Sequence, residues 1–198
     1  MGDQYAAPNP SNNLTIPKGI LYVAPWDGDT PPAESDFVDV GNASAVSVEP
    51  TREKLEHYSS RSGTKTKDRT AEISSGYNAN FTLDEMSMAN MAMFLRATIT
   101  ADFLLANENI GGFYALRFIS DNSYGRNFSI NCWKVEIAPE GALPLIGDEW
   151  MTMGFSGEGL DDTLNHPTSK FFTMRFTDAY ASGTTTSTTS STTTSTAS

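Results

Sequence analysis

The side chains best suited to metal binding or acid–base chemistry are the two histidines, and they lie far apart. His57 and His166 both fall in polar stretches of the 198-residue chain. Neither is followed, two to four positions later, by a second residue of a metal-ligating type. Metal and catalytic sites gather several such groups, so the sequence predicts two surface histidines and no metal centre.

The candidate nucleophiles are no better placed. The run Gly154-Phe155-Ser156-Gly157-Glu158 resembles a nucleophile elbow, but its fifth position is Glu and not Gly, and no helix is predicted after it. Cys132 stands beside Trp133 in an apolar run, which predicts a buried, inert thiol. We therefore expect no catalytic residue, no metal and no cofactor, and do not expect an enzyme.

The paired acidic residues also give no clear indication of a metal or catalytic site. Asp27-Gly28-Asp29 begins like a calcium loop, but Pro31 and Pro32 break the loop geometry, and no Glu occupies its twelfth position. Asp161-Asp162 are adjacent and should point apart. Asp84-Glu85 are more simply acids at a helix N-terminus, where they meet the positive end of the helix dipole.

Charge is distributed unevenly along the chain. The formal net charge is −11, which argues against a nucleic-acid binder held by phosphate contacts. From Arg52 to Arg69, however, six bases face three acids, giving +3 for this segment and −14 for the rest. A basic segment on an acidic body can dock electrostatically on another acidic body. The alternative is a solvated, flexible loop.

The elements around this basic segment follow from periodicity. Residues 56–69 are polar, with Gly63 near the middle, and predict a long loop. Residues 70–83 alternate, with Tyr77 and Phe81 on the apolar parity, and predict a strand with one wet face. Residues 84–95 change to helical spacing and predict a short amphipathic helix, capped by Thr82 with Glu85 or by Ser87.

The rest of the chain predicts mainly antiparallel β structure, a sandwich or barrel with one flanking helix. Further strands are expected at 18–25, 37–50, 112–120, 127–139, 149–158 and 170–177, and 97–109 is either a strand or the helix's tail. In 127–139 the apolar parity slips near Cys132-Trp133, which predicts a bulge or a change of packing environment.

Composition divides the chain into a polar N-terminal arm (1–17), a β domain (18–180) and a Thr/Ser-rich tail (181–198). One cysteine excludes an intrachain disulfide and allows a cytosolic origin. No run reads as a signal peptide or as a membrane span, so we expect no membrane insertion.

The order of several motifs resembles that of the major tail tube proteins of long-tailed bacteriophages. The motifs are GILYV (19–23), VDVG (38–41) with VSVE (46–49), the basic loop (56–69), FTLDE (81–85) with Ser87 and Asn90, and the closing KVEIAP (134–139), PLIGDEW (144–150) and MGFSG (153–157). Each motif is loose alone, and their order is the specific part. The resemblance covers roughly Gly19 to Leu160.

This resemblance implies that six copies form a ring, that the rings stack into a tube around a continuous inner β-barrel, and that the long loop reaches the next ring. The implied location is the virion tail, assembled in the bacterial host cytoplasm. The implied partners are further copies, the tape-measure protein, the tail tip or baseplate and tail terminator proteins, and double-stranded DNA that passes without specific binding. The residues expected to join rings are Arg61, Lys65, Lys67 and Arg69.

The bore of such a tube should be polar, so the polar parity of each strand predicts which residues line it. The candidates are Ser47, Glu49, Glu72, Ser74, Asn78, Asn80, Thr82, Thr152, Ser156 and Glu158. This set contains acids and no base, so phosphate would find little to bind. The opposite parity, which includes Tyr77, Phe81 and Phe155, is expected to pack in the core. Alternatives are a capsid decoration protein, a fibre or adhesin domain, a secretion-tube protein of related fold, or a hydrolase with a scattered site.

Overall fold

The structure is a computed structural model that describes residues 14–27, 30–61, 63–106, 112–122 and 125–176. The Thr/Ser-rich tail (181–198) and most of the N-terminal arm (1–17) therefore lie outside the described residues, as does part of the stretch 27–29 that begins like a calcium loop. Within the described ranges, no helix has the length and apolar character needed to cross a membrane.

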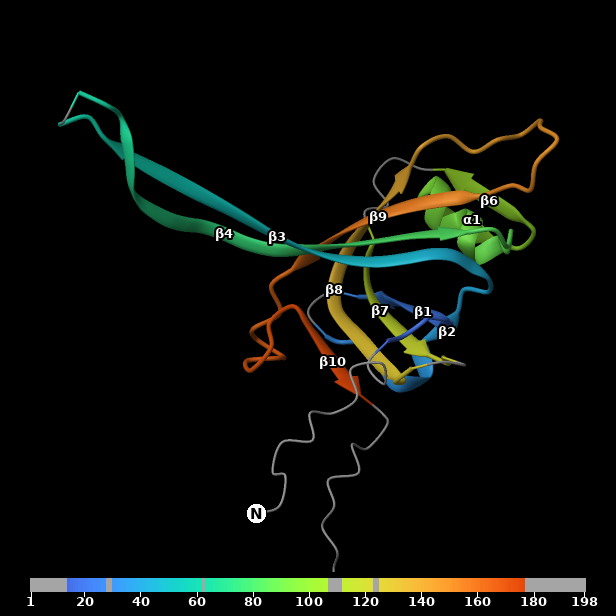
Figure 1. Ribbon diagram of the computed structural model, residues 1–198. Helices are drawn as coiled ribbons and strands as arrows, with labels where there is room; N and C mark the ends of the chain where they lie inside the picture. Colours follow the sequence, from blue (N-terminus) through green and yellow to red (C-terminus); the bar gives the residue numbers. More distant parts are fainter. Residues whose placement is uncertain (1–13, 28–29, 62, 107–111, 123–124, 177–198) are drawn as a thin grey trace, which may run out of the picture.

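The described chain is mainly β structure with one α-helix, as the sequence predicts (Figure 1). Its elements are β1 (Gly19–Trp26), the short 3-10 helix η2 (Glu34–Asp36), β2 (Val38–Asp39), β3 (Ala43–Ser59), β4 (Thr66–Leu83), α1 (Met88–Leu95), β5 (Ala97–Thr100), β6 (Phe103–Ala106), β7 (Phe113–Ser120), β8 (Phe128–Glu140), β9 (Met153–Leu160) and β10 (Phe172–Phe176).

Eight strands form one antiparallel sheet in the order β2-β1-β7-β8-β9-β4-β3, with β10 attached to β8. The hairpin β5–β6 stands apart as a second sheet, so residues 97–106 are a hairpin and not the tail of the helix. Strand β8 pairs with β10 over its first residues and with β9 over its last. Its register against β7 also shifts between Cys132 and Val135. The bulge and the change of partner together explain the parity slip.

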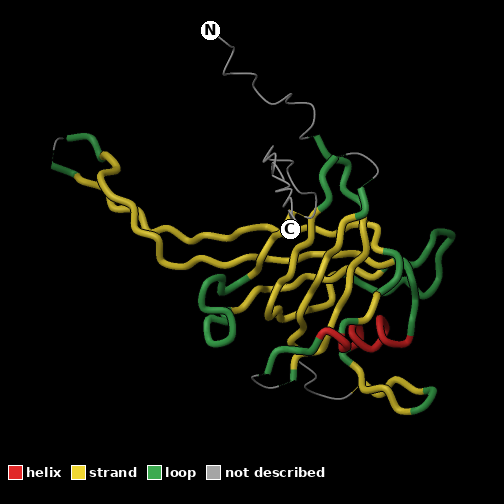
Figure 2. The backbone as a smooth tube through the Cα atoms, turned by 90° about the horizontal axis from the view of Figure 1, so that it is seen from below, coloured by secondary structure: helices red, strands yellow, loops and turns green. Residues whose placement is uncertain are grey.

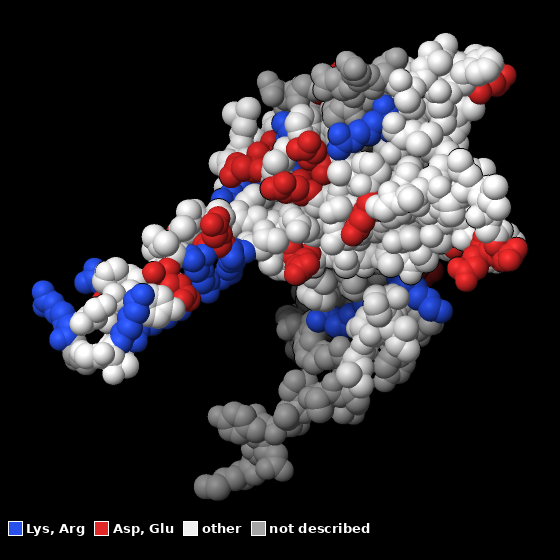
Figure 3. Space-filling view, turned by 90° about the horizontal axis from the view of Figure 1, so that it is seen from above, with Lys and Arg blue, Asp and Glu red and all other residues white. Residues whose placement is uncertain are grey.

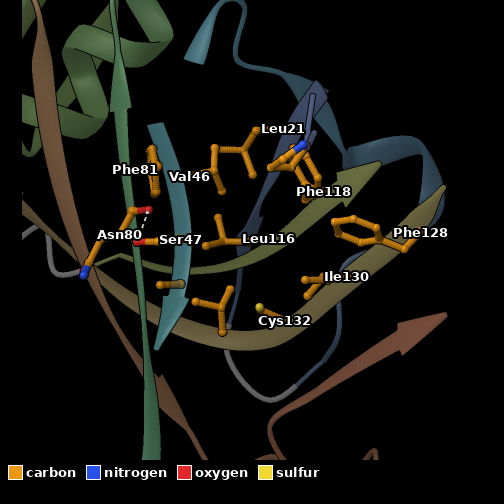
Figure 4. Close-up of a pocket in the computed structure, with 13 residues that line it drawn as sticks. Leu21, Val46, Ser47, Asn80, Phe81, Leu116, Phe118, Phe128, Ile130 and Cys132 are labelled. Atoms are coloured by element: carbon orange, nitrogen blue, oxygen red, sulfur yellow. Dashed lines mark hydrogen bonds between the residues drawn. The ribbon is translucent and has the colours of Figure 1, made fainter. Parts of the chain in front are cut away.

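The sheet bends at β8, so that β9, β4 and β3 face β1 and β7 across the core (Figure 1). The apolar parity of β4 and β9 fills this space: Tyr77, Phe81, Leu83, Met153 and Phe155 are all buried, as expected. A pocket opens in the apolar layer between β3–β4 and β7–β8 (Figure 4). Burial of these side chains is the main force that holds the two halves together.

Helix α1 covers one end of this core and begins later than predicted, at Met88. Ser87 is its N-cap, and its hydroxyl accepts a hydrogen bond from the backbone N–H of Asn90 at 3.1 Å. Residues 84–87 are not helical, so the proposed cap at Thr82 with Glu85 is wrong. Asp84 and Glu85 instead bind the turn before β3, where they accept hydrogen bonds from Asn42.

Candidate assembly surface

Strands β3 and β4 continue far beyond the sheet as a two-stranded arm (residues 51–76), seen in Figures 1 and 2. Strand β4 pairs with β9 only over Asn78–Leu83, so the arm has no third strand among the described residues. At about 3.4 Å per residue, the nine residues 51–59 carry it roughly 30 Å from the body. The predicted loop at 56–69 is therefore wrong, because most of it is strand and the turn spans only 60–65.

Among the described residues, the arm has little to stabilise it beyond the pairing of its own two strands. Isolated two-stranded ribbons are marginally stable in water, and unpaired strand edges invite pairing with another chain. The arm's exposed apolar side chains add to this, because Leu55, Ile73 and Tyr58 are 62%, 58% and 41% exposed. The ribbon presents two open backbone edges and apolar side chains to whatever approaches it.

Ion pairs and a hydrogen bond join side chains across the two strands of the ribbon. Arg52 lies 3.9 Å from Glu72, His57 Nδ1 lies 2.6 Å from Asp68, and Lys67 binds Glu56. The hydrogen bond from Lys67, and then that from Tyr58, lowers the pKa of the Glu56 carboxyl. Exposed pairs such as these each contribute little to stability.

The four predicted contact bases all lie towards the arm's tip. Arg61 and Lys65 lie in the turn, and Lys67 and Arg69 lie in β4; all four are exposed. The Lys65 ammonium lies 5.4 Å from the centre of the Tyr58 ring. Figure 3 shows the resulting concentration of Lys and Arg at the arm's end, with acids nearer the body. The segment therefore offers its positive charge at a position remote from the acidic body.

The polar parity of β3, β4 and β9 forms rows across three strands. Glu49, Asn78 and Glu158 are successive partners in one row, and Ser47, Asn80 and Ser156 are successive partners in the next. Thr82 follows on β4, and Ser74 continues the same face into the arm, opposite Glu53. The structure therefore brings eight of the ten predicted bore residues onto one face of the sheet.

The other two predicted residues, Glu72 and Thr152, lie elsewhere. Ile73 is an extra residue in β4: Ser74 pairs with Glu53, whereas Glu72 pairs with Lys54. Consecutive residues of β3 point to opposite faces, so this bulge puts Glu72 on the face opposite Ser74. Thr152 precedes β9 and lies in the exposed loop before it. Simple parity counts fail at both places because neither segment keeps a regular period of two.

Sequence reasoning missed a fourth member of the acidic row. Glu136 of β8 pairs directly with Glu158 of β9, so three carboxylates share the row with Asn78. Like charges placed directly opposite each other destabilise a sheet. The alternation of Glu136 with the apolar Val135 and Ile137 indicates a polar strand face. The parity slip near Cys132-Trp133 hides which face of the sheet Glu136 lies on. The row is a negatively charged stripe across four strands.

The remaining sequence candidates serve the fold. The His166 ring stacks on Trp133 at 3.7 Å, and its Nδ1 lies 2.6 Å from the buried Asp162. His166 is partly exposed, with 26% of its side-chain surface accessible, and His57 is exposed. In residues 14–176, leaving aside the undescribed gaps, no three His, Cys, Asp or Glu side chains are placed to hold a metal ion.

The pocket of Figure 4 is also unsuited to nucleophilic chemistry. Its lining is apolar apart from Ser47 and Asn80 at one side, and Cys132 is its sole thiol. Burial raises the pKa of the Cys132 thiol to about 11. The reactive form of cysteine is the thiolate, so a thiol with this pKa is inert near neutral pH. The described lining of this pocket therefore offers no thiolate near neutral pH.

A protein-family model matches part of the chain. The model of a family described as "Protein of unknown function UCP028589" matches residues 14–103, from just before β1 to the start of β6. The matched segment contains the whole arm, the helix α1 and two of the four strands that carry the polar rows. No curated protein matches the chain.

Proposed function

We propose that this chain is a structural virion protein, the major subunit of a bacteriophage tail tube. Six copies form each ring, and stacked rings form a conduit for double-stranded DNA. The observation that carries this proposal is the arm, which reaches roughly 30 Å from the body with both edges unpaired among the described residues. A ribbon so weakly supported by its own chain is best explained by binding to another copy.

The free edge of β3 supports ring formation. Strand β3 ends the sheet, and its outer edge has no partner over its seventeen residues in the described chain. Closing several sheets into a common barrel would pair such edges and remove the risk of aggregation. A closed barrel would also give the polar rows an enclosed, water-filled space to face.

The acidic row suits a conduit for DNA. Glu49, Glu158 and Glu136 lie in one row. Neither this row nor the neighbouring row that contains Ser47 includes a Lys or Arg among its paired residues. A negative wall repels phosphate, so DNA can move through without being held. In this proposal the tape-measure protein fills the bore during assembly, and tail tip or baseplate and terminator proteins close the ends. The tube belongs to the virion tail and assembles in the bacterial host cytoplasm.

Negative-stain electron microscopy of the purified full chain tests this proposal. Rings or striated tubes are the expected result, and both should appear as the protein concentration rises. A chain that stays monomeric at high concentration in sedimentation would contradict the proposal. That outcome would instead favour a capsid decoration protein or an adhesin domain, neither of which needs self-assembly.

A further inference from the structure

The loop between β8 and β9 (residues 141–152) packs Leu143 against the core but leaves three large apolar side chains in water. Leu145, Ile146 and Trp150 are 80%, 98% and 93% exposed. Soluble chains rarely leave such side chains together in water unless they bind something. The loop also curls around a hollow whose lining includes Asp148, Glu149 and Trp150.

The hollow has the chemistry of a receptor for cations. Two carboxylates beside an indole can take a Lys or Arg side chain through charge and through contact with the ring face. Moreover, no Lys or Arg occurs between Lys134 and Lys170, whereas seven Asp or Glu do. Any basic side chain that fills the hollow must therefore come from a distant part of the chain or from another molecule.

The arm and this loop cannot meet within one molecule. The arm leaves the body on one side and the 141–152 loop leaves it on the other, as Figures 1 and 2 both show. The arm's tip carries Arg61 and Lys65, together with the exposed Tyr58. One surface is therefore basic and aromatic, the other is acidic and apolar, and they lie at opposite ends of the same chain.

We infer that the 141–152 loop is the docking site for the arm of a second copy. Arg61 and Lys65 enter the hollow beside Asp148 and Glu149, and the loop's apolar side chains cover the ribbon. Because the two surfaces differ, the contact is head-to-tail, and between stacked rings it leaves free arms at one end of the tube and free loops at the other. This inference rests on the proposed function, and it adds which surface receives the arm.

Charge reversal on each surface tests this pairing. The full chain is made with R61E and K65E, with D148K and E149K, and with Lys18→Glu as a reversal outside both surfaces. Each double variant alone should need about tenfold or more protein for half-assembly, because its arm and loop now carry like charges. Sedimentation and electron microscopy measure the assembled fraction, and Lys18→Glu should assemble like the unaltered chain.

Mixing the two double variants gives the decisive result. The acidic arm of one then meets the basic loop of the other, and the reverse pair is also complementary, so an equal mixture should recover assembly to within about twofold of the unaltered chain. Failure of the mixture to recover, with the unaltered chain forming rings, overturns the docking site and leaves the tube proposal standing. Absence of assembly by the unaltered chain overturns both. Recovery into filaments without rings keeps the docking site and overturns the tube.

Discussion

The side-chain amide of Asn90 donates a hydrogen bond of 2.8 Å to the backbone carbonyl of Val40, fifty residues earlier in the chain. The same amide nitrogen donates to the carbonyl of Glu85 at 2.9 Å, and Asn90 is 2% exposed. One buried side chain therefore fixes the start of α1 against the turn from which β3 begins. This contact positions the start of β3, the strand whose far end forms one side of the arm.

Replacing Asn90 with Ala should destabilise the fold. The change leaves the carbonyl of Val40 buried without this donor, which costs about 1–3 kcal/mol of unfolding free energy. Urea denaturation of the dilute protein measures the loss. The matched control is Asn42→Ala, which removes an exposed hydrogen bond to Asp84 and should cost less than about 1 kcal/mol. Equal losses in the two variants would contradict the role given to Asn90.

The packing of β9 against the core requires a glycine at position 159. A Cβ atom added there would lie 1.9 Å from the ring of Tyr77, which is itself 1% exposed. Gly159→Ala should therefore cost about 1–3 kcal/mol through overpacking. Gly147→Ala is the control, because nothing lies within 4 Å of its added Cβ. Thermal unfolding compares them, and a Gly159→Ala chain as stable as the control would show that β9 can move away.

Because the thiol of Cys132 is buried, the free energy of unfolding should vary with pH in the alkaline range. Burial raises the pKa of Cys132 to about 11, so in the folded chain the thiol stays protonated while in the unfolded chain it ionises near pH 9. Above that pH the unfolded state binds fewer protons, and the free energy of unfolding falls as pH rises, by on the order of 2–3 kcal/mol up to pH 11.

The test compares pH slopes, not absolute stabilities. Cys132→Ala should flatten the decline between pH 9 and 11 in urea titrations. Burial, and then the nearby thiol, also raises the pKa of Tyr77, so Tyr77→Phe should remove a further part of the decline above pH 10. If the slope of Cys132→Ala matches that of the unaltered chain, the thiol does not titrate as described.

The acidic row of Glu49, Glu158 and Glu136 should lower the free energy of unfolding of the isolated subunit. Glu158 lies directly opposite Glu136, so Glu158→Gln relieves a like-charge pair and should raise the unfolding free energy by roughly 0.2–1 kcal/mol. Glu49→Gln, opposite Asn78 on β4, is the control and should change it less. The difference should shrink in 1 M salt, where screening shortens the Debye length to about 3 Å. A lower free energy of unfolding for Glu158→Gln than for the unaltered chain would contradict repulsion between Glu158 and Glu136.

The arm's charges should matter for assembly and not for folding. Replacing Arg61, Lys65, Lys67 and Arg69 with Ser should leave rings intact but reduce the yield and length of tubes, if the arm joins rings. Electron microscopy measures tube length, and circular dichroism checks that the fold is kept. Unchanged tube yield would argue that the arm acts inside the ring and not between rings.

The sequence predicted most strands because burial imposes a period of two on them. The apolar parity of Tyr77, Phe81 and Phe155 is visible in the letters, and it is the parity that fills the core. Most of the arm, residues 51–69, had no such signal. Its strands face water on both sides, so residues 56–69 looked like a loop, although pairing between β3 and β4 makes most of them strand.

Register irregularities were the second thing hidden from the sequence. The extra residue Ile73 reverses the face of Glu72, and nothing in the local pattern marks it, because Ile73 itself fits the apolar parity while being 58% exposed. Likewise, the row partner Glu136 depends on how β8 meets β9 across the sheet. Such pairings between distant strands are set by the whole topology and cannot be counted along one segment.

The most direct test of the tube proposal is a cryo-electron microscopy map of the assembled full chain. The proposal predicts a tube of stacked six-membered rings in which Glu49, Asn78 and Glu158 line the bore and Tyr77 faces the outer layer. A tube in which the face of Val46 and Val48 lines the bore, or an assembly without a continuous inner barrel, would contradict it.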